Sequence, residues 1–305
     1  PPLSWRLAPL LLEHDPTLLY ADGGSLKSML ALYFAILIQR GVSHGRLIPK
    51  AGNVLYLDWE TSWETQERRM LLLQAGIPLM EKADMLYRRC YLPLADEITE
   101  LQKLVIKEHV DYAIVDSLSG ACGSDLEAQE TAAKLFSALA TLRIGSMIIT
   151  HVAKQNTGAF GSAYWKNYSR SVFEAKTTHE TESSQATVAL FHRKMNDGPL
   201  LAPMGFEFHF SPGNIQVRTK EVKQLTDFIG DMTLKDQLKV VLHNRKMVVK
   251  TLAEEVGKPE GTVRATLNKH KDIFTHMDDG RWARVTPPGR YGDQGEQSTD
   301  TDEEA

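Results

Sequence analysis

Two glycines, a lysine and two serines lie within seven residues near the start of the chain, in the stretch Asp22-Gly-Gly-Ser-Leu-Lys-Ser28. Glycines let a backbone turn with its N–H groups pointing inward, and inward N–H groups bind anions. A lysine and a hydroxyl directly behind the turn supply a cation for phosphate and a ligand for a metal ion. This order is typical of a phosphate-binding loop, in which Lys27 would hold the β- and γ-phosphates of ATP and Ser28 would hold Mg²⁺.

The flanking segments fit a strand–loop–helix unit. Residues 18–20 form a short apolar run before the loop, and residues 29–39 repeat apolar side chains with the period of a helix. The free N–H groups and the positive dipole at the start of this helix would favour bound phosphate. The predicted cofactor-binding residues are Asp22, Gly23, Gly24, Ser25, Leu26, Lys27, Ser28 and Met29.

Two positions depart from the pattern G-x-x-x-x-G-K-[ST]. Ala21 occupies the first glycine position, and Leu26 occupies the glycine position before the lysine. A Cβ atom at the second position would strain the loop or displace a phosphate. For this stretch alone, an ordinary glycine-rich turn with a surface lysine is the alternative interpretation.

Two further apolar runs end in carboxylates, the first in Asp58 and Glu60 and the second in Asp116. An apolar strand that closes on Asp is typical of the Walker B element, so we predict that Asp116 and Ser28 hold the metal ion. Glu60 is the candidate for the base that orients the attacking water. Because residues 61–64 resemble a capping box, a helix-capping acid is the alternative for Glu60.

A third apolar run, residues 146–149, ends in the polar residues Thr150 and His151. His151 would contact the γ-phosphate and report its state, whereas a capped strand end with a satisfied histidine is the alternative. Polar residues thus gather at the carboxyl ends of several predicted strands, where open α/β sheets bind their ligands. This clustering favours a nucleotide site over a simple turn.

Residues 17–152 alternate strands with helices, and each strand is a near-continuous apolar run. This pattern predicts an α/β fold with a mostly parallel sheet that is covered on both faces. Residues 171–179, 185–194 and 207–218 then alternate apolar and polar side chains, which predicts antiparallel strands. The loop 155–167 between the two regions would contact single-stranded DNA through its aromatic residues, or would be a surface lid.

Residues 221–286 are predicted to form a small domain after a larger domain of residues 1–220. The predicted elements of the small domain are helices at 234–243, 249–256 and 262–270 and a hairpin at 274–285. That order is typical of a winged helix, whose third helix would enter the major groove of duplex DNA. A protein-docking or spacer role is the alternative. The acidic residues 287–305 are predicted to be a disordered tail.

The composition is that of a globular protein, with 42% hydrophobic and 24% charged residues. The formal net charge of −4 provides no general basic field for nucleic acid. Cys90 and Cys122 lack metal-type spacing, and no apolar run reaches the ~18 residues of a membrane span. Together with the absence of a signal peptide, these features predict a cytoplasmic protein without membrane contact.

The chain resembles RecA-like ATPases, and most closely the AAA-domain family of the plasmid and phage replicative helicase RepA. The resemblance covers about residues 5–218. The stretches that carry it are Tyr20-Ala-Asp-Gly-Gly-Ser-Leu-Lys-Ser28, Leu55-Tyr-Leu-Asp-Trp-Glu60, Ala113-Ile-Val-Asp-Ser117, Ile149-Thr-His-Val152, Gly161-Ser-Ala-Tyr-Trp165 and Arg170. It implies a RecA-like P-loop fold, ATP and Mg²⁺ as ligands, and ATP hydrolysis.

The resemblance also implies roles for the matched residues. The catalytic base, the Walker B aspartate and the γ-phosphate sensor of that family correspond to Glu60, Asp116 and His151. The implied activity is that of an ATPase acting on DNA, as a helicase or a remodelling motor in replication or recombination. An ATP-switched DNA-binding regulator with little turnover and a non-enzymatic scaffold are the alternatives.

RecA-like helicases insert a Lys-x-Arg-x-Gly-Pro finger into the site of the neighbouring subunit. In this chain the stretch Lys194-Met-Asn-Asp-Gly-Pro199 has Asn196 where the arginine is expected, so Arg193 or Arg170 would supply the cation. Since such a finger comes from a neighbour, the resemblance implies a homo-hexamer or another ring. A solvated hairpin turn is the alternative for this stretch.

Overall fold

The computed structural model describes residues 2–77, 84–152, 163–179 and 182–285. The chain separates into two compact units, Pro1–Phe228 and Ile229–Ala305, each with a hydrophobic core of its own. The boundary predicted from the sequence lies between residues 220 and 221.

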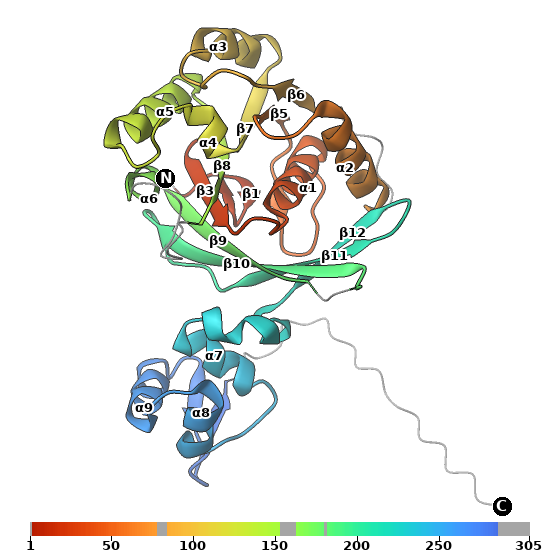
Figure 1. Ribbon diagram of the computed structural model, residues 1–305. Coiled ribbons are helices and arrows are strands. Elements are labelled where there is room, and N and C mark those ends of the chain that lie inside the picture. The colour runs from red at the N-terminus through yellow and green to blue at the C-terminus, as the bar shows by residue number, and fades with distance from the viewer. Residues whose placement is uncertain (1, 78–83, 153–162, 180–181, 286–305) are drawn as a thin grey trace, which may run out of the picture. The chain divides into compact units, whose positions relative to one another are not determined.

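A nine-stranded sheet forms the centre of the first unit, in the order β12-β11-β10-β9-β3-β8-β7-β5-β6 (Figure 1). All neighbours from β9 to β6 in this order are parallel, and the neighbours from β9 to β12 are antiparallel. The mostly parallel sheet confirms the predicted α/β class. The strands are β3 (Pro16–Ala21), β5 (Asn53–Asp58), β6 (Leu86–Arg89), β7 (Val110–Asp116), β8 (Gly145–His151), β9 (Ser171–His179), β10 (Gln185–Met195), β11 (Met204–Phe210) and β12 (Ile215–Lys220).

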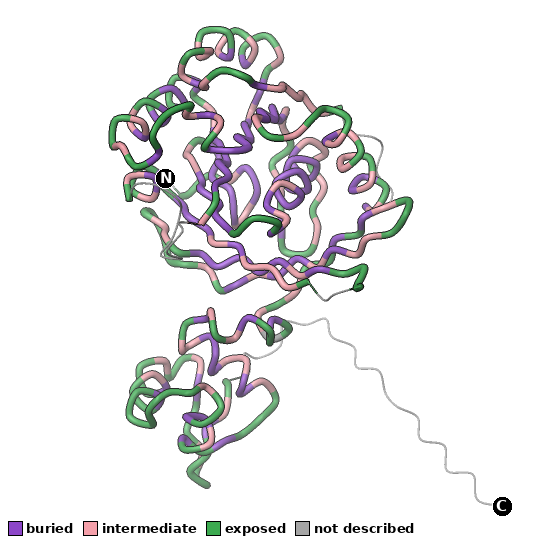
Figure 2. Tube along the Cα trace, in the orientation of Figure 1, coloured by how far each residue is buried: buried purple, intermediate pink, exposed green. Residues whose placement is uncertain are grey.

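Helix α1 (Lys27–Arg40) is enclosed by the sheet, and every residue from Met29 to Ile38 is buried (Figure 2). Parallel strands pack on one side of it, and the curved antiparallel strands supply further core residues, among them Phe206 and Phe208 of β11. An enclosed helix needs apolar residues all round, which explains the apolar sequence of α1. It has 14 residues, and no helix in the described part of the chain is long and apolar enough to cross a membrane.

The other face of the sheet packs against α3 and α5, whose apolar residues form a second core with the strands. Strand β3 shows the alternation, since Leu18 and Tyr20 belong to this second core whereas Leu19 and Ala21 belong to the core around α1. Helices therefore cover both faces of the sheet. The remaining helices of the unit are α2 (Trp63–Ala75), α3 (Ile98–Lys107), α4 (Leu118–Cys122), α5 (Gln129–Leu142), α6 (Tyr164–Tyr168) and the short η1 (Val222–Gln224).

Three segments differ from their prediction. No strand is predicted before β3, yet the residues there form β1 (Trp5–Ala8) and β2 (Leu11–Leu12), which make a small sheet with β4 (Ile48–Pro49). The short helix α4 before α5 is not predicted either, and the strand predicted at 207–218 is the hairpin of β11 and β12. Such short elements lack enough residues to show a period.

Three helices and a two-stranded antiparallel sheet make up the described part of the second unit. They are α7 (Leu234–Val241), α8 (Val249–Val256), α9 (Glu260–Lys269), β13 (Phe274–His276) and β14 (Trp282–Arg284), and η2 (Thr226–Asp231) crosses the boundary between the units. Leu252 of α8, Val263 of α9 and Phe274 of β13 are fully buried in its core. Helix α8 ends where Gly257 adopts a left-handed conformation (φ 61°), which glycine tolerates because it has no Cβ atom.

Candidate active site

Strands β3, β5, β7 and β8 end at one edge of the sheet. Asp58 on β5 lies opposite Asp116 on β7, and Ala21 on β3 lies opposite His151 on β8. The loops that follow parallel strands meet at their shared carboxyl edge. The structure thereby brings together the predicted phosphate loop, Glu60, Asp116 and His151.

Leu26, the residue before the lysine, adopts the left-handed conformation with φ 58° and ψ 19°. The sequence pattern requires glycine at this position, and the structure shows that the leucine takes a glycine-like backbone conformation. A left-handed residue with a Cβ atom costs about 1–2 kcal/mol. The Leu26 side chain is partly buried against the core around α1, and this packing offsets part of the cost.

The Lys27 ammonium group lies inside the loop. Its Nζ atom donates hydrogen bonds to the carbonyl oxygens of Ala21 (3.1 Å) and Asp22 (2.6 Å) and to the hydroxyl of Ser25 (3.2 Å). Burial lowers the pKa of Lys27, and the nearby carboxylates, first that of Asp116, oppose this shift. The loop thus holds a cation against its own backbone, where a phosphate oxygen could replace the carbonyl partners.

The space beside the glycines is open. A Cβ atom built on Gly23 or Gly24 would meet no atom within 4 Å, so this face of the loop is free to accept a ligand. From β9, the Thr177 hydroxyl donates to the carbonyl of Ser25 (2.9 Å) and fixes the loop on its other side. The side chain of Met29, which is predicted to contact the cofactor, is buried in the core around α1.

Asp116 carries a carboxylate oxygen that lacks a partner. The side chain is buried, and its Oδ2 atom accepts a hydrogen bond from the Tyr56 hydroxyl (2.6 Å). Its Oδ1 atom has no hydrogen-bond partner among the described residues. Burial raises the pKa of Asp116 to about 6, while the hydroxyls of Tyr56 and Ser28 oppose this shift.

These features fit a magnesium ion that is held mainly by a nucleotide. Mg²⁺ prefers oxygen ligands and usually takes one or two protein groups together with phosphates and water. The unpartnered oxygen of Asp116 and the nearby hydroxyl of Ser28 supply such groups. The described residues contain no cluster of three or more His, Cys, Asp or Glu that would hold a metal alone.

Asp58 holds the turn that carries Glu60. Its side chain is fully buried, and its Oδ1 atom accepts hydrogen bonds from the backbone N–H groups of Glu60 and Thr61, both at 2.8 Å. Tyr87 and Arg89 on β6 hydrogen-bond to the same side chain at 3.4 Å. Burial raises the pKa of Asp58, opposed by the two backbone donors.

The Glu60 side chain is 44% exposed at the mouth of the site. Its Oε1 atom accepts a hydrogen bond from the Ser117 hydroxyl, and the Nε2 atom of His151 lies 4.0 Å away. The N-cap of α2 is Ser62, which accepts from the backbone N–H of Thr65 (3.4 Å), so the capping role is filled without Glu60.

The contacts of Ser117 and Asp58 with Glu60 were not predicted from the sequence. Each touches Glu60 and sits at the end of its strand, so the only signal in the sequence is that position. Burial and the cation of Lys27 lower the pKa of His151, which favours its neutral imidazole.

Two of the candidate finger cations, Arg170 and Lys194, lie away from this edge. Ser171, the first residue of β9, is opposite Thr17, near the amino end of β3. Arg170 precedes it, and its Nε atom lies 3.7 Å from Asp15. In the same chain these cations are therefore not part of the described site, and their role in a neighbouring site stays a prediction.

The finger residues on β10 make contacts within their own chain. The Arg193 guanidinium bonds to Glu174 (2.7 Å), and Lys194 donates to the carbonyl oxygens of Asn167 (3.0 Å) and Ser169 (2.7 Å) at the end of α6. Lys194 thus donates hydrogen bonds to backbone carbonyl groups that have no partner within the helix.

The aromatic contact with single-stranded DNA predicted for loop 155–167 is wrong for Trp165. This residue is fully buried, and its Nε1 atom donates to the carbonyl of Leu126 (2.8 Å). Its ring therefore anchors α6 and is not available to stack on a base. Residues 155–162 of the loop lie outside the described residues.

A mostly parallel sheet with a phosphate loop after β3 and acidic residues at the carboxyl ends of β5 and β7 defines a P-loop nucleotide-binding domain. Residues 1–157, just over half of the chain, match the family described as AAA domain, and the chain belongs to this family. Among solved structures, a KaiC-like protein from the hyperthermophilic archaeon Pyrococcus horikoshii OT3 is similar, with 14% identity and a TM-score of 0.46, over 70% of this chain and 93% of that chain. The search of curated proteins found no match.

Proposed function

We propose that the chain hydrolyses ATP at the carboxyl edge of its sheet. The observation that carries this proposal is the convergence of the loop lysine, the buried Asp116 with an unpartnered oxygen, and the exposed Glu60. ATPases of this class need a phosphate cradle, a metal ligand and a group that orients water, and the three residues offer one of each.

Each residue would have a separate task. Lys27 and the loop N–H groups would hold phosphates, and Ser28 and Asp116 would hold Mg²⁺, which neutralises phosphate charge when it is bound. Glu60 is fixed by Ser117 yet reaches solvent, so its carboxylate would accept a hydrogen bond from the attacking water. His151, as a neutral imidazole beside Glu60, would sense whether a γ-phosphate is present.

The direct test is phosphate release from ATP by the parent chain, Lys27→Ala and Glu60→Gln. We expect both variants to lose turnover, Lys27→Ala together with nucleotide binding and Glu60→Gln with binding retained. Glu64→Gln is the matched control, because Glu64 is a fully exposed carboxylate of α2 outside the site. A parent chain that binds ATP without hydrolysis would favour the regulator, and one that binds no ATP would favour the scaffold.

We further propose that hydrolysis drives work on DNA, as in the RepA-like helicases that the chain resembles. Single-stranded DNA would then stimulate turnover, whereas an ATP-switched regulator would bind duplex DNA in an ATP-dependent way without stimulated turnover. Comparing phosphate release with and without single-stranded DNA separates the two, and an unstimulated rate would count against a motor.

A ring assembly is supported by the position of the finger cations. Arg170 and Lys194 lie near the amino end of β3, away from the site of their own chain, so a neighbouring subunit would be needed to use them. Light scattering with ATP and Mg²⁺ should show a homo-hexamer or another ring. If Arg170→Ala and Arg193→Ala hydrolyse ATP as the parent does, neither arginine acts as the finger.

The second unit is proposed to be a winged helix. Three helices followed by a two-stranded hairpin match the element order of that motif. In this proposal the second unit supplies a duplex-binding module to the ATPase.

A further inference from the structure

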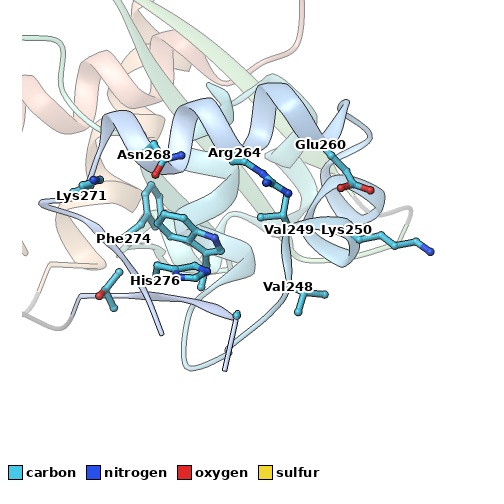
Figure 3. Close-up of a pocket in the computed structure, with 12 residues that line it drawn as sticks. Val248, Val249, Lys250, Glu260, Arg264, Asn268, Lys271, Phe274 and His276 are labelled. Carbon is cyan, nitrogen blue, oxygen red and sulfur yellow. The ribbon is translucent and has the colours of Figure 1, made fainter. Parts of the chain in front are cut away.

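The second unit carries a groove of about 750 Å³ between helix α9, the first residues of α8 and the β13–β14 hairpin (Figure 3). Its floor is apolar, because the rings of Phe274 and Trp282 belong to the core of the unit. Its rim carries Lys250 from α8, Arg264 from α9 and Lys271 from the segment after α9. The groove therefore combines a packed floor with a positively charged rim.

The core determines which face of α9 lines the groove. Val263 and Leu267 are fully buried on the inner face. Glu260, Arg264 and Asn268 follow one another at intervals of four residues and so share one face, and Figure 3 shows them projecting from α9 toward the groove. A carboxylate, a guanidinium and an amide are thus presented in a row along one helix.

The groove cations form no salt bridge with a described carboxylate, whereas three other cations of the unit do. Residues 229–285 hold eleven Lys and Arg against eight Asp and Glu, so the net charge is small and the pairing decides where positive charge remains. Arg245 pairs with Glu255 (2.7 Å), and Lys239 pairs with Asp236 (2.9 Å). The three cations of the groove rim make no salt bridge with any described carboxylate. The groove rim thus carries three cations without a salt-bridge partner, beside the single carboxylate of Glu260.

We infer that this groove binds duplex DNA selectively, with Lys250 and Lys271 on backbone phosphates and Arg264 and Asn268 on base edges in the major groove. Arg can bond to guanine and Asn to adenine through two hydrogen bonds each, and Glu260 can accept from the amino group of cytosine. The inference rests on the proposed winged helix and is independent of ATP hydrolysis.

The dimensions and the chemistry favour B-form DNA over RNA. An α-helix with its side chains is about 10–12 Å across, which fits a DNA major groove about 12 Å wide. The major groove of A-form RNA is too narrow for such a helix. His276 of β13 is exposed on the opposite side of the groove, packs against the ring of Trp282, and offers a further donor to the backbone.

The phosphate contacts are tested on the full chain without nucleotide, by fluorescence anisotropy with a labelled duplex of about two turns of DNA. We expect Lys250→Ala with Lys271→Ala to weaken duplex binding about tenfold or more and to reduce the slope of log affinity against log salt by about two. Lys269→Ala is the matched control, because Lys269 is an exposed lysine of α9 that does not line the groove. The assignment of Lys250 and Lys271 to phosphate contacts would be overturned if the double variant bound the duplex as tightly as the parent chain. It would also be overturned if Lys269→Ala weakened duplex binding as much as the double variant does.

The base contacts are tested by selection of bound sequences from a random duplex library, followed by sequencing. We expect the parent chain to select a short motif, and Arg264→Ala and Asn268→Ala each to lose about tenfold discrimination at a different position of it. Absence of any selected motif, or an unchanged motif in both variants, would overturn base reading. An RNA duplex of the selected sequence should bind more weakly, and equal binding would refute recognition through the major groove.

Phosphate release from ATP is measured on the same variants. If the chain binds duplex DNA but does not hydrolyse ATP, the proposed DNA-binding groove is supported and the proposed ATPase activity is refuted. If it hydrolyses ATP but does not bind duplex DNA, the ATPase activity is supported and the DNA-binding groove is refuted.

Discussion

At the scale of single residues, Glu60 is held from two directions. Asp58 fixes the backbone that carries it, and Ser117 binds its carboxylate from the neighbouring strand. A carboxylate that must orient water gains from such support, since small displacements of a reacting group lower rates strongly. Asp58 is therefore assigned as a positioning residue within the proposed ATPase.

Replacing Asp58 separates its hydrogen-bonding role from its charge. Asp58→Ala removes the acceptor for two N–H groups, so we expect kcat for ATP hydrolysis to fall about tenfold to hundredfold with little change in KM. Asp58→Asn keeps an acceptor oxygen and should retain most of kcat. Steady-state kinetics, with thermal unfolding as the folding control, checks both. An equal loss of kcat in the two variants would contradict the positioning role.

The buried carboxyl of Asp116 should make the stability of the first unit depend on pH. Burial raises its folded pKa to about 6, above the unfolded value near 3.9, so the charged form is disfavoured in the fold. The free energy of unfolding is therefore highest below about pH 4, where Asp116 is protonated in both states. It decreases as the pH rises through about 6, where the folded protein must ionise the buried carboxyl. Asp116→Asn carries no charge and should therefore be more stable than the parent by up to about 3 kcal/mol at about pH 8, with a much smaller difference at about pH 4.

Chemical denaturation at the two pH values, without nucleotide and metal, measures this difference. The variant should also lose ATP hydrolysis, because its amide is a poor ligand for Mg²⁺. The same stability difference at both pH values would show that Asp116 does not titrate in this range.

At the scale of elements, the strand–loop–helix unit depends on the left-handed conformation of Leu26. Leu26→Gly adopts this conformation without a Cβ atom, so we expect it to bind ATP at least as tightly as the parent. Leu26→Ile keeps the size and apolarity of the side chain, but a β-branched residue disfavours positive φ more strongly. We expect it to bind about tenfold more weakly, as measured with a fluorescent ATP analogue. Equal binding by both variants would show that the loop does not need this conformation.

The elements that the sequence predicted well are those with a clear period or an uninterrupted apolar run. Strand β9 begins and ends where alternation predicted, and α8 covers the predicted residues. Two-residue strands such as β2 carry no period, and the left-handed Leu26 has no signal because leucine rarely adopts it. The burial of Trp165 depends on α5 and on Leu126, which tertiary packing alone brings next to it.

The candidate site was predictable to the extent that parallel strands share an edge. Motifs placed Lys27, Glu60, Asp116 and His151 at strand ends, and the strand order then brought them together. The hydrogen bonds of Ser117 and Asp58 could not be predicted, because they depend on which strands are neighbours. Sequence order alone does not show that β7 lies between β5 and β8.

At the scale of the whole molecule, the two units have separate cores with no shared residue among the described ones. Duplex binding and ATP hydrolysis are accordingly proposed for different units. This separation predicts that each unit can be destabilised without the other.

Two leucine-to-alanine variants test that independence. Leu252 of α8 and Leu37 of α1 are both fully buried, so each replacement should cost its own unit about 2–5 kcal/mol. Differential scanning calorimetry of the full chain should show Leu252→Ala lowering one transition while ATP turnover without DNA stays at the parent level. Leu37→Ala should lower the other transition and reduce turnover, with duplex binding retained while the second unit is folded. A single transition lowered by both variants would mean that the units unfold together, and the loss of turnover in Leu252→Ala would tie hydrolysis to the second unit.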